Sequence, residues 1–131
     1  MANWSDDIKL KVWNKCRTIP GKSEKEYRLD EQGAQIKWSD YGKYTGNGWQ
    51  IDHIYPEAEL QELGVEQEKI DDETNLRALN SFNNDTKSNS YPNFDSSKEY
   101  DKDKDRNVDV TKHWNVTPSK QAQLKKYFGI K

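Results

Sequence analysis

The sequence lacks several features that would assign it to a protein class at once. It has a single cysteine, Cys16, which excludes both an internal disulfide and a cysteine-rich zinc site. No apolar stretch approaches the ~18 residues of a membrane-spanning helix, and the first residues lack the apolar segment of a signal peptide. The formal net charge is -2, so the chain shows no overall basic excess of the kind that marks many nucleic-acid-binding proteins. We therefore expect a cytoplasmic protein without membrane contact, although secretion as an effector stays open.

Apolar residues are scarce as well, at 31% of the chain against 34% for charged residues. Aromatic residues compensate in part, because five Trp and seven Tyr each remove much apolar area from water when buried. With 131 residues the chain has the length of one domain, and we expect residues 1–131 to form a single one. The tryptophans are spread along the sequence, which indicates that both ends return to one core.

Two segments near the ends of the chain have the pattern of capped helices. Ser5, followed by two aspartates, predicts the start of an N-terminal helix over about residues 5–17. Thr117 and Pro118 predict the start of a C-terminal helix over about residues 117–128. A glycine directly after this second segment predicts its end.

Residues 33–90, between these helices, are expected to form the centre of an α+β fold. Apolar residues alternate with polar ones over 34–38 and again over 49–53, as half-buried strands require. The connection between them is rich in turn residues, so we expect the two strands to form a β-hairpin. Further along, residues 71–79 are expected to be irregular.

The rest of this central part is predicted from turn residues and charge. Short helices are expected over residues 57–63 and 81–87, the second of them capped by Asn80 or Ser81. In residues 88–110 lysine and aspartate alternate and apolar residues are few. We expect no regular structure there.

Three residues have the chemistry of a metal-dependent hydrolase. Asp52 directly precedes His53 at the end of the second predicted strand, and Asn84 lies on the predicted helix downstream. Carboxylate and amide oxygens are ligands suited to Mg²⁺ or Mn²⁺, and an imidazole can take a proton from an attacking water. Neighbouring strand residues point to opposite faces, so Asp52 and His53 can serve one site only if the strand end is twisted or bulged.

The stretch WQIDHIYP, followed by NLRALNSFNNDTKSN, resembles the signature of the HNH nucleases. In that signature W-x-I-D-H-I-x-P precedes N-L-x-x-L and then N-N-x-x-K on a helix, and the resemblance covers roughly residues 13–89. It implies a ββα-metal (His-Me finger) core in which a hairpin and a short helix carry the catalytic centre. Asp52 and Asn84 would then hold one divalent metal ion, His53 would be the general base, and Asn75 would brace the catalytic loop.

The resemblance also implies contacts with nucleic acid, and it departs from the family in two respects. Lys87 and Arg77 fall where the family often places phosphate-binding side chains, and Lys37 is a further candidate. Asn83 replaces Asn84 as the ligand if the helix register differs by one residue. Many members hold a structural zinc through cysteine pairs, which this chain cannot do. The helix ligand is Asn where some members have His, which favours Mg²⁺, or else Mn²⁺, over Zn²⁺.

We therefore expect a bacterial or phage-encoded endonuclease that hydrolyses DNA, with RNA as a further possible substrate. A toxin-type nuclease with little base preference, partnered by an immunity protein, is one alternative, and a restriction or phage role is another. From a different class, a catalytically silent nucleic-acid-binding module would keep only the scaffold. The joint presence of Asp52, His53 and Asn84 favours the enzyme.

Overall fold

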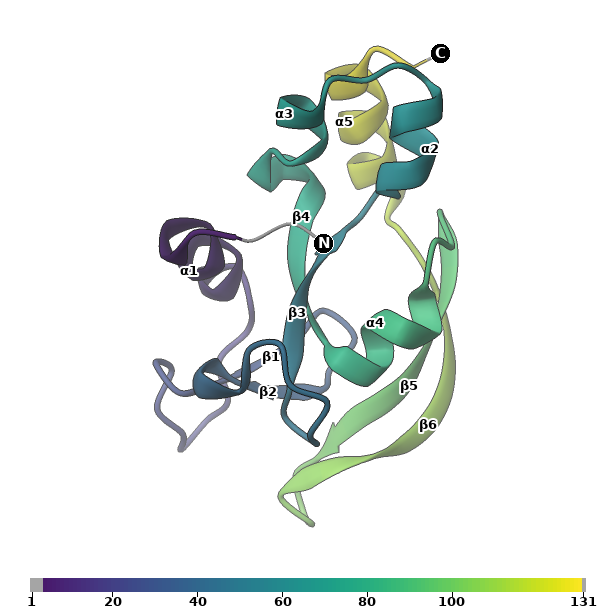
Figure 1. Ribbon diagram of the computed structural model, residues 1–131. Coiled ribbons are helices and arrows are strands. Elements are labelled where there is room, and N and C mark those ends of the chain that lie inside the picture. Colours follow the sequence, from purple (N-terminus) through teal and green to yellow (C-terminus); the bar gives the residue numbers. More distant parts are fainter. Residues whose placement is uncertain (1–3, 131) are drawn as a thin grey trace.

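The computed structural model describes residues 4–130 and shows a small α+β protein (Figure 1). The predicted α+β class is thereby confirmed. Within the described residues the helices are α1 (Asp6–Asn14), α2 (Glu57–Glu62), α3 (Gln67–Ile70), α4 (Ser81–Lys87) and α5 (Pro118–Phe128), with 3₁₀ turns at Trp38–Asp40 and Glu73–Asn75. None of these helices is long and apolar enough to cross a membrane.

Three antiparallel pairs of strands are present over the same residues, each forming a separate sheet. The pairs are β1 (Tyr27–Leu29) with β2 (Gln35–Lys37), β3 (Trp49–His53) with β4 (Leu76–Asn80), and β5 (Asn93–Asp101) with β6 (Arg106–Asn115).

The predicted hairpin between 34–38 and 49–53 is wrong in its pairing. Both segments contain strands, but β2 pairs with β1, and β3 pairs with β4 in a register that sets His53 opposite Leu76. The expectation of an irregular segment at 71–79 is wrong for residues 76–79, which belong to β4, while residues 71–75 contain only turns. All five residues of β4 are buried, so this strand has no alternation of apolar and polar residues by which it would be recognised.

The expectation of no regular structure at 88–110 is also wrong, because β5 and β6 form a long hairpin across much of this segment (Figure 1). The alternating lysines and aspartates at 102–105 form the turn of this hairpin, where Asp101 Oδ1 accepts hydrogen bonds from the Asp103 and Lys104 amides. On the strands, Lys98 forms a cross-strand ion pair with Asp109.

The predicted helix starts are confirmed by their caps. Ser5 Oγ accepts a hydrogen bond from the Ile8 amide, and Thr117 Oγ1 accepts one from the Lys120 amide. Asn80 is the cap of α4, and Gly129 ends α5 in the left-handed conformation with φ of 68°. The N-terminal helix is shorter than expected, since α1 ends at Asn14.

Among residues 4–130 the buried apolar side chains form two clusters, and the expected single core is wrong in this respect. The first cluster lies between α1 and the β3–β4 pair and contains Trp13 and Trp49, with Trp4 and Trp38 packed against it. The second cluster contains residues of α5 and β5, and Trp114 packs there. The end of β3 leads from one cluster to the other, since Ile51 belongs to the first and Ile54 to the second.

Candidate active site

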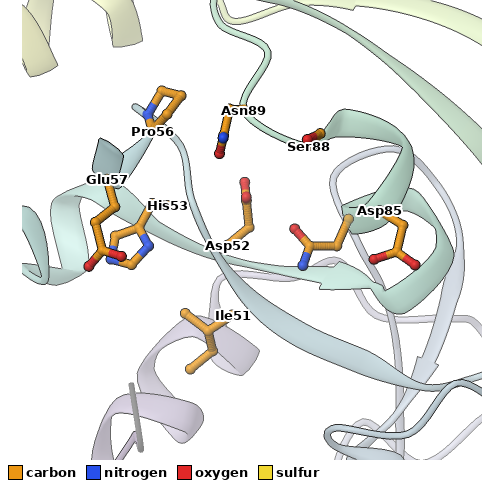
Figure 2. Close-up of a pocket in the computed structure, with 9 residues that line it drawn as sticks. Ile51, Asp52, His53, Pro56, Glu57, Asp85, Ser88 and Asn89 are labelled. Atoms are coloured by element: carbon orange, nitrogen blue, oxygen red, sulfur yellow. The ribbon is translucent and has the colours of Figure 1, made fainter. Parts of the chain in front are cut away.

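A polar pocket of about 330 Å³ lies where β3 ends, between α2 and α4. Asp52, His53 and Asn84 all line it, so the structure brings the three predicted site residues to one place. Glu57 and Asp85 line it too, which makes the pocket acidic. Figure 2 shows the Asp52 carboxylate in the middle of the pocket and the His53 ring beside Glu57.

Asp52 is buried and forms ion pairs with two cationic side chains. Its Oδ2 accepts a hydrogen bond from Arg77 Nε at 3.1 Å, and its Oδ1 accepts one from Lys87 Nζ at 3.2 Å. Burial lowers the pKa of Arg77, but the carboxylates of Asp52 and Glu31 outweigh it and the net shift is upward. Burial also lowers the pKa of Lys87, and the Asp52 charge offsets this only in part. The carboxylate of Asp52 is thus neutralised from inside the protein.

None of the three residues expected to contact nucleic acid lines this pocket. Arg77 is 4% exposed and Lys87 is 1% exposed, and both donate to Asp52. Lys37 lies on β2, where its ammonium is over the Tyr27 ring, 5.7 Å from the ring centre. Nucleic-acid binding by these residues stays a prediction. In this arrangement Arg77 and Lys87 both form ion pairs with Asp52.

His53 faces a different set of partners. Its Nε2 lies 2.8 Å from Asp71 Oδ1, and its ring centre lies 5.6 Å from that of Trp4. Gln67 supports this pair, since its Nε2 donates to Asp71 Oδ1 at 3.0 Å and to Glu57 Oε2 at 2.7 Å. Asp52 and His53 therefore do point to different sides of β3. They still line one pocket because it lies at the strand end.

Sequence reasoning missed one group at this site. One ligand-type atom each of His53, Glu57 and Asp71 lie within 4.8 Å of one another, a spacing that can hold a metal ion. The three residues come from β3, from the first turn of α2 and from the residue after α3. No local pattern distinguishes these two acids among the 23 of the chain, so only their meeting in space identifies them.

Asn84 and Asn83 have clearly different surroundings. Asn83 is buried and fully bonded: its Nδ2 donates to Asp30 and to the Lys98 carbonyl, while its Oδ1 accepts from the Ser97 and Lys98 amides. Asn84 lines the pocket, with its Nδ2 donating to Gln50 Oε1 at 2.7 Å. The alternative register, with Asn83 as the ligand, does not fit this arrangement.

Asn75 braces the segment that follows His53. Its Oδ1 accepts from the Tyr55 amide at 2.8 Å, and its Nδ2 donates to the carbonyls of Tyr55 and Ile70 at 3.1 and 3.2 Å. The side chain is fully buried and is absent from the pocket lining. It therefore shapes the loop beside the pocket and has no contact with a reacting group.

The pocket thus combines an imidazole held by a carboxylate, an amide, and a group of acids, one of which is neutralised internally. We compared the chain with models of protein families, with curated proteins and with solved structures, and none of them matches it.

Proposed function

We propose that the pocket at the end of β3 is the active site of a metal-dependent endonuclease of the HNH kind that hydrolyses phosphodiester bonds in DNA. One observation carries the proposal: the antiparallel pair β3–β4 leads directly into α4, and Asp52, His53 and Asn84 line one pocket. A ββα-metal core, which the motif resemblance implies, consists of two strands followed by a helix. The strand pair in question is β3–β4, whose strands are connected through α2 and α3, in place of the hairpin expected from the sequence.

The charge of the pocket supports a requirement for a cation. The carboxylates of Glu57 and Asp85 line it beside Asp52, whose charge is balanced by Arg77 and Lys87, and they would repel the phosphate of a nucleic acid. The oxygens of Asp52 and the amide oxygen of Asn84 are hard donors that suit Mg²⁺ or Mn²⁺. Each oxygen of Asp52 carries one hydrogen bond and retains a second lone pair. A bound divalent ion would offset this charge and stabilise the developing charge on the phosphate.

The contact between His53 and Asp71 supports a role for His53 as the base. With Nε2–H donating to Asp71, the lone pair is on Nδ1, where it can accept a proton from water. The Asp71 carboxylate then stabilises the positive charge that the ring acquires.

The cluster of His53, Glu57 and Asp71 supports a variant of this proposal. An imidazole with two carboxylates also suits Mn²⁺ or a softer ion, and His53 would then be a metal ligand instead of a base. The two arrangements differ in metal preference, since an imidazole ligand disfavours Mg²⁺.

A plasmid-nicking assay tests the proposal. The protein is incubated with supercoiled DNA in Mg²⁺, in Mn²⁺ and in EDTA, as wild type, as His53→Gln and as His113→Gln. His113 is a matched control, because it also pairs with an aspartate but is exposed on β6, outside the pocket.

We expect nicking only with a divalent ion, a loss of at least about a hundredfold in His53→Gln, and full activity in His113→Gln. Nicking in EDTA, or equal nicking by His53→Gln and wild type, would refute the proposal. Activity in Mn²⁺ with none in Mg²⁺ would favour His53 as a ligand.

A further inference from the structure

A second pocket, of about 410 Å³, lies where the end of α1, the first turn of α5 and the strands β4, β5 and β6 meet. Arg77 lines it, whereas Asp52, to which Arg77 is bonded, lines the first pocket. The two pockets are therefore separate and share one ion pair between them. Phe94 and Trp114 form an apolar part of the wall.

Two buried polar atoms at this pocket have no hydrogen-bond partner within residues 4–130. They are Arg77 Nη2, a donor, and Gln32 Oε1, an acceptor, and each residue is only 4% exposed. Both residues line the pocket. A buried polar group without a partner is destabilising, so two such atoms at one pocket indicate that a ligand supplies the missing bonds.

Two ammonium groups add further donors. Lys15 Nζ donates to the carbonyls of Glu73 and Leu76, and Lys120 Nζ donates to the Thr74 carbonyl and to Gln123. Each ammonium has three protons, so each keeps one for a ligand. The two amines are held on carbonyls of the same short segment and line the same pocket.

The pocket carries an excess of positive charge. Lys15, Arg77 and Lys120 line it with one carboxylate, Glu31, which accepts from Arg77 Nη1 at 2.9 Å. Arg77 is also paired with Asp52, so the excess charge comes from the two lysines. Burial lowers the pKa of Lys120, and the charges of Lys15 and Arg77 lower it further, while nearby acids offset this in part. An anion in the pocket would relieve this repulsion.

We propose that this second pocket binds inorganic phosphate. Arg77 Nη2 and the spare protons of Lys15 and Lys120 can donate to the oxygens of an oxyanion, and Gln32 Oε1 requires a donor, which a P–OH group supplies. Inorganic phosphate keeps a P–OH group at neutral pH. Sulfate, carboxylates and phosphodiesters lack this hydroxyl, and a phosphate monoester, whose second pKa is about 6, loses it beside cationic side chains. The proposal does not rest on nuclease activity.

Binding is measured by NMR titration of ¹⁵N-labelled protein with inorganic phosphate, with sulfate as the matched control. The two anions stabilise proteins in a similar non-specific way, so a difference between them reports the site. We expect saturable shifts of the Trp114 indole and Gln32 amide signals with phosphate, and shifts at least about threefold weaker in affinity with sulfate. Adenosine monophosphate, a phosphate monoester, should bind more weakly than inorganic phosphate at pH 8, because it carries no P–OH group there. Equal binding of the two would contradict the role of the hydroxyl.

Variants assign the effect to the pocket. Lys120→Gln, and independently Lys15→Gln, should weaken phosphate binding by about tenfold, because each removes a charge-assisted hydrogen bond. Lys126→Gln, on the exposed face of α5, should bind as wild type does. The proposal is overturned if phosphate gives no saturable shift at these signals, if sulfate binds equally well, or if both pocket variants bind as tightly as Lys126→Gln does.

Discussion

Replacing Asn75 by alanine should destabilise the protein strongly, although this residue lies outside the candidate active site. The side chain makes three hydrogen bonds to main-chain groups of Tyr55 and Ile70, and it is fully buried. Alanine leaves all three groups without partners, at a net cost of about 1 kcal/mol each. We expect the free energy of unfolding to fall by about 3 kcal/mol, and the melting temperature by roughly 10 °C.

The assay is urea unfolding followed by tryptophan fluorescence, without added metal, so that binding of an ion does not affect the result. Asn14→Ala, at the exposed end of α1, is the matched control and should change the stability by less than about 0.5 kcal/mol. Asn75→Asp separates hydrogen bonding from packing, because aspartate keeps the volume but loses both donors. We expect it to be at least as unstable as Asn75→Ala at pH 7.

Two outcomes would refute this reasoning. If Asn75→Ala unfolds within about 1 kcal/mol of wild type, the three bonds contribute little and Asn75 does not brace the loop. If Asn75→Asp is as stable as wild type, the loss in the alanine variant comes from the cavity alone.

Two other predictions concern single side chains. At pH 8, long-range ¹H–¹⁵N spectra should show the ring proton of His53 on Nε2, where it is bonded to Asp71. The ring proton of His113 should be on Nδ1, where it is bonded to Asp95. The same tautomer in both rings would contradict the observed pairing. Burial, reinforced by nearby acids, raises the pKa of the Cys16 thiol to about 12, so a thiol reagent at pH 8 should label the protein only in denaturant, and rapid labelling of the folded protein would contradict the packing around this residue.

Local features could be predicted from the sequence because they depend on neighbours along the chain. A helix start needs only a capping side chain and the next few amides, so Ser5 and Thr117 were correctly predicted as caps, and Asn80 was one of the two candidates for the third. Asp52 and His53 are neighbours in the sequence, so their proximity could be predicted as well. The motif was sufficient to predict that Asn84 lies near Asp52 and His53, since it specified both the strand end and the helix.

Pairing between distant segments was decided only by the tertiary structure. Alternation identified β3 as a strand but carried no information about its partner, and β4 is buried along its whole length and shows no alternation. In the same way Asp71 reaches His53, and Arg77 reaches Asp52, across loops that a local pattern does not describe. Charges brought together by folding determine which carboxylate is neutralised and which donors remain free. A sequence read residue by residue has no access to that balance, because it depends on distances through space.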